Sequence, residues 1–355
     1  MHIDPKGDNI FNFTTITIAA GSILKLSEVK LHGPVYFLAQ GDVAINGVID
    51  LSGDDSPGPT ATAAEQIPAS AGSGGYSGGL GGVHGDSNHQ ALPGNGPGGG
   101  AAGDVNNPFA QGGTFTTDRF LVPLVGGSGG GGTNDNNQYG AQGGAGGGAL
   151  LIASSTRIRL IGAGGDTTNN GQIWAFGGNG GPRGCGGSGG AVRLVANAIS
   201  FESDSDGIWV TPKGGVACLD KNGPTNGLIR LETVTPITSI HAAIGGPLIE
   251  SVPFALNLPS VPPPVITVAS IDGMAINANP FSFPDRTINT GAPVPVVIQA
   301  TNLPTNATVT IYLLSDTQAN QAIPVTLQGT TASSSATVPV TFPQGGSRGF
   351  VKAKW

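Results

Sequence analysis

The segments that decide the fold are GGSGGGG at 126–132, GGAGGGALLIASSTRIRL at 143–160, GQIWAFGGNGG at 171–181 and GGSGGAVRLVANAISF at 186–201. In these segments glycine tracts alternate with short apolar stretches of the kind that form buried strands. A flexible linker would lack the apolar stretches, and an ordinary enzyme core would lack the glycine. The pattern predicts two layers of a stacked β structure.

The same three-part unit recurs along the chain. It consists of a five-residue apolar run, two apolar residues separated by one position, and a segment that begins at glycine. The apolar runs are Val35–Ala39, Ala149–Ala153 and Ala191–Val195, and a partial fourth copy is Gly227–Glu232. Three short strands per repeat indicate one coil of a parallel β-helix. The period of two in a strand predicts that these side chains point inward: Ile158, Leu160, Ile199, Phe201, Ile229 and Leu231.

Charged residues occupy alternate positions and are expected to point outward: Arg157, Arg159, Arg193, Arg230 and Glu232. In this register the arginines stack down one face. The simpler interpretation is that these arginines only keep that face of the sheet hydrated. The alternative makes Arg193 and Arg230 binding residues.

The glycine is concentrated in one part of the chain, since 41 of the 61 glycines lie between Ala71 and Gly190. Residues 54–148 form a large insertion between the first and second coils. It is either a flexible coil or a packed bundle in which glycine allows backbones to approach closely. The packed alternative has possible anchors in isolated large residues, namely Tyr76, Leu80, Phe109, Phe115 and Tyr139.

The chain is therefore expected to be all-β, with a short right-handed parallel β-helix followed by a β-sandwich. Residues 1–33 form opening strands or a cap, and residues 34–232 form the β-helix with its insertion. Residues 233–263 form a proline-rich linker or a strand that leads out of the β-helix. Six short strands between 264 and 355, separated by turn signals such as NLPTN and PQGGS, predict the sandwich.

Composition limits the partners. Only 10% of the residues are charged and the net charge is −7, which argues against nucleic acid or an anionic membrane as partner. No apolar run reaches the roughly 18 residues that span a bilayer, so no membrane insertion is expected. The N-terminus, MHIDPKGDNIFNF, has no signal-peptide pattern, so either Met1 begins a processed or recombinant chain or the protein is not exported. The Thr, Asn and Gly richness favours the first and an extracellular location.

Two cysteines, Cys185 and Cys218, flank glycine-rich bends. In an exported protein they would form a disulfide worth about 3–4 kcal/mol, and the alternative is two unpaired thiols. Neither has zinc-site spacing.

Two short motifs resemble metal sites. Glu202, Asp204 and Asp206 alternate before a glycine, as at the start of a calcium loop, but the distant bidentate acid is missing. A solvated turn is the competing interpretation. His84, Asp86 and His89 lie within six residues and could hold a metal if the loop curled, although no further ligand is identifiable.

A polysaccharide lyase or hydrolase on this fold would need a pair or triad of carboxylates on one face. The acids at coil ends are Asp50, Asp54, Asp55 and Asp166. Their spacing does not single out a catalytic set, and no cofactor is expected beyond a possible Ca²⁺.

Trp174 and Trp209 occupy nearly equivalent places in consecutive coils. If the neighbouring isoleucines point inward, both indoles point outward and stack as a pair that grips sugar rings. Alternatively, the glycine insertion covers them.

Three resemblances extend this interpretation. The motifs GGAL at 147–150 and GGAV at 189–192 resemble the GGA(I/L/V) repeats of β-helical surface adhesins such as polymorphic outer-membrane passengers, although the companion FxxN repeat is missing. The GG-x tracts resemble the polyglycine-II sandwiches of certain phage tail adhesins and glycine-rich antifreeze proteins. The C-terminal strand pattern is similar to immunoglobulin-like or fibronectin-like modules.

The sequence thus predicts a non-enzymatic structural or adhesive protein, secreted or at the cell surface, that assembles with itself into a fibre or layer or binds a surface polysaccharide. One alternative is a carbohydrate-active β-helix enzyme or polysaccharide-binding module. Another is a phage fibre-tip adhesin.

Overall fold

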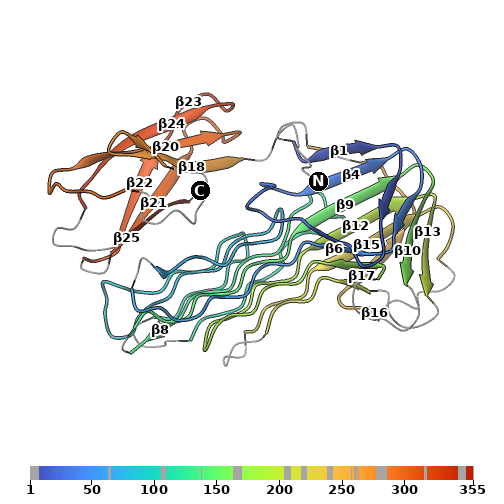
Figure 1. Cartoon of the computed structure of the whole chain (residues 1–355), viewed down its shortest axis with the longest axis horizontal. Coiled ribbons are helices and arrows are strands. Elements are labelled where there is room, and N and C mark those ends of the chain that lie inside the picture. The colour runs from blue at the N-terminus through green and yellow to red at the C-terminus, as the bar shows by residue number, and fades with distance from the viewer. Residues whose placement is uncertain are drawn as a thin grey trace. The chain divides into compact units, whose positions relative to one another are not determined.

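The computed structural model (Figure 1) describes the chain except for residues 1–7, 63–64, 105–108, 137, 163–169, 204–208, 217–221, 238–242, 257, 260–261, 263, 277–285, 316–317, 343–348 and 355. The described residues form strands β1 to β25 and no α-helix. Accordingly, no helix that could span a membrane is found in this part of the chain. The chain divides into two compact units. The first comprises 1–59, 66–85 and 90–260, and the second comprises 60–65, 86–89 and 261–355.

The first unit contains three parallel sheets, each with a defined spatial order of strands. Sheet A consists of β1 (Ile10–Phe13), β4 (Val35–Ala39), β9 (Ala149–Ser154), β12 (Ala191–Ala196), β15 (Leu228–Thr233) and β17 (Leu248–Ser251), in that order. Sheet B consists of β13 (Ala198–Ser203), β10 (Arg157–Gly162), β5 (Val43–Ile45) and β2 (Ile16–Ile18). Sheet C consists of β16 (Ala243–Ile244), β14 (Trp209–Thr211), β11 (Gln172–Trp174), β6 (Val48–Asp50) and β3 (Ile23–Lys25).

From β1 to β6 and from β9 to β14, consecutive strands enter sheets A, B and C in turn, and we call each such set of three a rung. Each strand pairs in parallel with its equivalent in the next rung, so that Ile158 lies opposite both Val43 and Ile199. The period of two then directs one side of every sheet toward a shared core. All six side chains predicted to point inward lie in that core, which confirms the predicted strand register.

Two segments that flank the repeated units also contribute strands to the three sheets. The first 33 residues do not merely precede the stack, because β1, β2 and β3 form a complete rung in register with β4, β5 and β6. The expected linker 233–263 contributes β16 and β17 to sheets C and A. Opening strands were predicted in the first segment, whereas β16 in the second segment has only two residues and gives no periodic signal.

The described glycine tracts are packed together by backbone hydrogen bonds, and Figure 1 shows them as extended traces running side by side. Amides three residues apart donate to the same neighbour. The amides of residues 127, 130 and 133 donate to the carbonyls of residues 147, 144 and 141, in that order. The amides of residues 140, 143 and 146 donate to the carbonyls of residues 82, 79 and 76 in the same way. Amides 144 and 147 donate to carbonyls 185 and 188, and amides 145 and 148 donate to carbonyls 54 and 51. Segment 140–148 therefore donates to three neighbouring segments with a three-residue period.

The backbones approach too closely for any other residue. A Cβ added to Gly143 would lie 1.9 Å from the carbonyl oxygen of Gly130, and one added to Gly146 would lie 1.9 Å from that of Gly127. Of the expected anchors in this region, Leu80 and Tyr139 are buried, whereas Phe109 is exposed. Two short strands, β7 (Gly82–Val83) and β8 (Asn134–Asp135), pair in parallel within it.

The second unit contains two antiparallel sheets. One has the order β19 (Met274–Ala275), β18 (Val265–Ile271), β20 (Val294–Thr301), β24 (Ser334–Val340) and β23 (Gln328–Gly329). The other has the order β22 (Gln321–Thr326), β21 (Thr308–Ser315) and β25 (Gly349–Lys354). Apolar residues of both sheets share one core, including Val296, Ile298, Val309 and Ile311. The six predicted strands are present, and the predicted strand at 322–329 is divided between the two sheets as β22 and β23.

Candidate functional site

The outer face of sheet A, turned away from the shared core, is covered by other parts of the chain. Tyr36 and Leu151 on this face are buried in a second apolar cluster with Leu121 and Leu124 of the glycine-rich insertion, and Leu256 packs against it. Burial raises the pKa of Tyr36 to about 12, although the charge of Arg193 acts in the opposite direction. Around Tyr36 and Leu151 this face is consequently an internal surface of the first unit.

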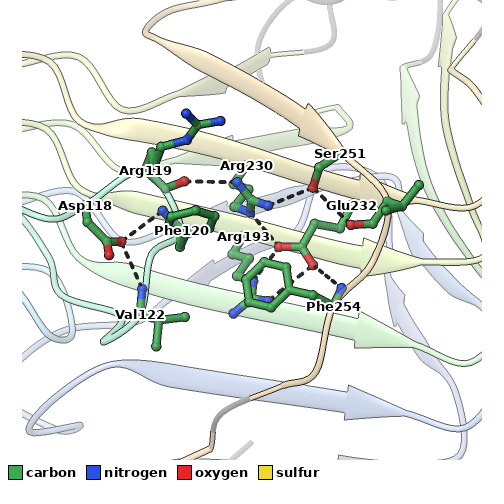
Figure 2. Close-up of polar contacts among 10 residues, drawn as sticks. Asp118, Arg119, Phe120, Val122, Arg193, Arg230, Glu232, Ser251 and Phe254 are labelled. Carbon is green, nitrogen blue, oxygen red and sulfur yellow. Dashed lines mark hydrogen bonds and ion pairs between the residues drawn. The ribbon is translucent and has the colours of Figure 1, made fainter.

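Three charged residues lie within this covered face. Arg193 on β12 is directly opposite Arg230 on β15, and Glu232 follows Arg230 on the same side of the strand. The Arg193 Nε–H donates to Glu232 Oε1 at 2.9 Å, and the Arg230 Nε–H donates to the same oxygen at 2.7 Å (Figure 2). One carboxylate thus neutralises one of two adjacent guanidinium groups.

The outward orientation predicted for these residues is confirmed, but the expectation that they meet solvent is wrong. The side chains of Arg193, Arg230 and Glu232 are 1%, 3% and 0% exposed. Neither arginine is available to a ligand in this structure, which removes the reason for proposing Arg193 and Arg230 as binding residues. Strand periodicity predicts which side of a sheet a residue occupies, and it does not predict what covers that side.

The covering segments are attached to this charged cluster. The backbone N–H of Phe254 donates to Glu232 Oε2 at 3.3 Å, and the Phe254 ring centroid lies 4.3 Å from the guanidinium carbon of Arg193. Arg230 donates to the backbone carbonyl of Arg119 at 3.0 Å. The cluster therefore fixes the segments around 119 and 254 to the sheet, and its role is to hold structure together. Figure 2 shows Phe254 beside Glu232 and the two arginines.

Sheet B presents ion pairs that are open to solvent. The Arg159 Nε–H donates to Glu202 Oε1 at 2.8 Å, and the Arg157 Nε–H donates to Asp42 Oδ2 at 2.7 Å. The hydrogen bond from Arg159 is the main cause that lowers the pKa of Glu202 to about 2. Hydrogen bonds from Thr156 and then Arg157 lower the pKa of Asp42.

Among the residues that the structure describes, neither predicted metal motif forms a complete ligand set. Glu202 is committed to Arg159, while Asp204 and Asp206 lie outside the described residues. His89 Nδ1 lies 2.5 Å from Asp86 Oδ2, and its Nε2 lies 2.8 Å from the carbonyl oxygen of Gln318, so both ring nitrogens are occupied. Within the described part of the chain, no group of three or more potential ligands is positioned around a common point.

Cys185 is buried and disulfide-bonded. Cys218, the other cysteine of the chain, lies outside the described residues, as does Asp166. The pairing of Cys185 with Cys218 therefore stays a prediction.

The two tryptophans do not lie opposite each other. Trp174 pairs with Thr211 of β14, two residues beyond Trp209, so the expected alignment of the two is wrong. The inward residue of β14 is Val210, paired with Ile173. The side chain of Trp209 lies outside the described residues. Among the described side chains, Phe176 is an aromatic neighbour of Trp174, with ring centroids 6.3 Å apart.

The sequence predicted that Glu232 points outward but did not predict its hydrogen bond with the backbone of Phe254. It also did not predict the ion pair of Lys25 with Asp50 on sheet C. Lys25 Nζ lies 3.1 Å from Asp50 Oδ2, across adjacent rungs. The sequence could have predicted the Lys25–Asp50 pair, because aligning residues 11–31 as a full rung places Lys25 opposite Asp50. No local signal links 254 to 193.

Comparison of the chain with protein-family models, with curated proteins and with solved structures found no match.

Proposed function

We propose that this protein is a structural and adhesive protein of the cell surface or extracellular space, that it assembles with itself into a fibre or layer, and that it is not an enzyme. Its first unit would be a short right-handed parallel β-helix with a bundle of polyglycine-II helices attached, and its second a β-sandwich. The observation that carries the proposal is the close backbone packing of the glycine tracts.

The β-helix interpretation is supported by the strand order. Consecutive strands enter three parallel sheets in turn and enclose one apolar core. The right-handed sense follows from the strong preference of parallel β connections for that hand.

The polyglycine-II interpretation is supported by the three-residue period of the hydrogen bonds, because that helix has three residues per turn. In segment 140–148 the amides point in three directions and each direction finds a different neighbour. Side chains are nearly absent from these contacts, so the bundle has few rotamers that could readjust. A rigid body of this kind suits a load-bearing or presenting role better than a site that must move.

Self-assembly is supported by strand edges at the end of the stack. Among the described residues, β2 is the last strand of sheet B. Ile16 donates to the carbonyl of Asp42, and the carbonyl of Ile18 accepts from Asn46, so these two residues face β5. The N–H and C=O of Thr17 between them point away from β5, toward the open edge. β1 and β3 end sheets A and C at the same rung.

The opposite end of the stack carries edges of the same direction. Among the described strands, β17, β13 and β16 end sheets A, B and C there. Because every strand of the three sheets runs parallel, a second copy placed head to tail can continue the ladders without reversing direction. Such a contact is heterologous and produces an open filament.

Electron microscopy of the concentrated protein and of a Thr17→Pro variant tests this proposal. Proline removes the outward N–H and is tolerated where that group faces an open edge. We expect filaments from the wild-type protein and dispersed monomers from the variant, with little change in melting temperature.

Thr17→Val is the matched control, because it keeps the N–H and the β-branched side chain. It should form filaments like the wild-type protein. If the wild-type protein stays monomeric by light scattering at all concentrations, the proposed assembly is wrong. Filaments of equal number from Thr17→Pro would refute the role of this edge.

A further inference from the structure

The outer face of sheet C carries an aromatic pair. Trp174 and Phe176 are two residues apart, so they lie on the same side of the chain, and both are half-buried. Their ring planes are inclined at 52°. The Trp174 Nε1–H donates to Gln172 Oε1 at 2.6 Å, and Gln172 is itself buried. This hydrogen bond fixes the orientation of the indole before any ligand arrives.

Charged residues adjoin the pair on the preceding rungs. Asp50 lies directly opposite Trp174, and Lys25 lies directly opposite Asp50. Lys25 Nζ is 3.1 Å from Asp50 Oδ2, donates to the carbonyl of Ser52 at 3.1 Å and lies 3.9 Å from Asp54 Oδ1. The Lys25 and Asp54 side chains are 43% and 57% exposed, so both reach solvent, and the Asp50 side chain is 15% exposed.

A second lysine adjoins the pair on the next rung. The backbone carbonyl of Lys213 accepts a hydrogen bond from Gly177, which places Lys213 alongside Phe176, and its side chain is exposed. Lys25 and Lys213 lie among three carboxylates, Asp50, Asp54 and the exposed Asp55, whose Oδ1 accepts from the backbone N–H of Asn179. The face thus combines two aromatic rings, two ammonium donors and three carboxylate acceptors.

We propose that this face binds an uncharged polysaccharide, whose sugar rings stack on Trp174 and Phe176 and whose hydroxyl groups bond to Lys25, Asp50 and Asp54. Aromatic faces provide apolar contact area to the C–H groups of a sugar, and charged hydrogen-bond partners are stronger than neutral ones. An anionic polymer would be repelled by the three carboxylates, which outnumber the two ammonium groups. The inference rests on the adhesive part of the proposed function and supplies its ligand.

Affinity electrophoresis of the full chain tests this site, with gels that contain a soluble neutral polysaccharide (a mixed-linkage β-glucan, a galactomannan, a xyloglucan or dextran) or an anionic one (alginate or polygalacturonate). We expect retardation by at least one neutral polymer. Trp174→Ala should weaken that retardation at least tenfold, and Trp174→Phe should keep it within about threefold, since one ring replaces another. Phe109→Ala, which removes an exposed aromatic residue from the glycine-rich insertion, should change nothing.

Three results would overturn the inference: no retardation by any neutral polymer, stronger retardation by the anionic ones, or full binding by a Trp174→Ala variant whose melting temperature equals that of the wild-type protein. The outcome is separable from that of assembly, because Thr17→Pro should still bind the polysaccharide as a monomer. Binding without filaments refutes only the proposed assembly, and filaments without binding refute only this site.

Discussion

At the scale of single residues, the buried charges on sheet A impose the strictest requirement on the sequence. Arg193 and Arg230 are withdrawn from water, and Glu232 is the carboxylate that contacts both. Burying a charge is costly unless it is paired and hydrogen-bonded. Phe254 adds a ring near both guanidinium groups, at 4.3 and 5.0 Å, which provides cation–π stabilisation.

Substitution of Glu232 should therefore be severe. Glu232→Gln leaves two buried guanidinium groups without this counter-charge, and we expect the free energy of unfolding to fall by about 3–5 kcal/mol. Glu202→Gln, which breaks a solvent-exposed pair with Arg159, is the matched control and should cost less than about 1 kcal/mol. Urea unfolding measures both. Equal losses from the two variants would mean that the buried cluster has no special role.

The pH dependence of stability should report the Glu202 pair. Its pKa in the folded protein is about 2, below the ordinary value of 4.5. A depressed carboxyl pKa contributes stability that is fully present above pH 4.5 and is lost as the pH falls toward 2. The stability difference between the wild-type protein and Glu202→Gln should therefore shrink across this window, as urea midpoints at several pH values can measure. A difference that stays constant across the window contradicts the assigned pair.

At the scale of elements, the strands were predictable because each rung repeats the same short apolar pattern. Ile158 and Leu160, with their equivalents at 199 and 201, point inward as the period of two requires. The strands of 233–263 could not be found in this way, because β16 has only two residues and gives no period. The coverage of Arg193 also escaped prediction, since it depends on the distant segments around 119 and 254.

The glycine tracts should be intolerant of any side chain. A Cβ on Gly143 would lie 1.9 Å from a backbone carbonyl oxygen, so Gly143→Ala must separate two hydrogen-bonded segments. We expect a loss of about 3 kcal/mol or more and faster hydrogen exchange of the neighbouring amides. Gly41→Ala, whose Cβ would lie 3.1 Å from its nearest atom at a turn, should cost about 1 kcal/mol or less. Similar exchange rates in both variants would show that the tracts are not tightly packed in solution.

At the scale of the whole molecule, the stack of rungs and the strand edges at its ends support the proposed end-to-end polymerisation. The rungs provide ladders that can continue into another copy. The aromatic face of sheet C would then repeat along a filament, so that weak sugar contacts add through multivalency.

The most direct test of end-to-end assembly is X-ray diffraction from aligned filaments of the wild-type protein. If copies add through the ends of the stack, the strands lie across the filament axis and their separation of about 4.8 Å runs along it. End-to-end assembly predicts a strong meridional reflection at about 4.8 Å. Filaments that place this reflection on the equator, or a protein that forms no filaments, would contradict it.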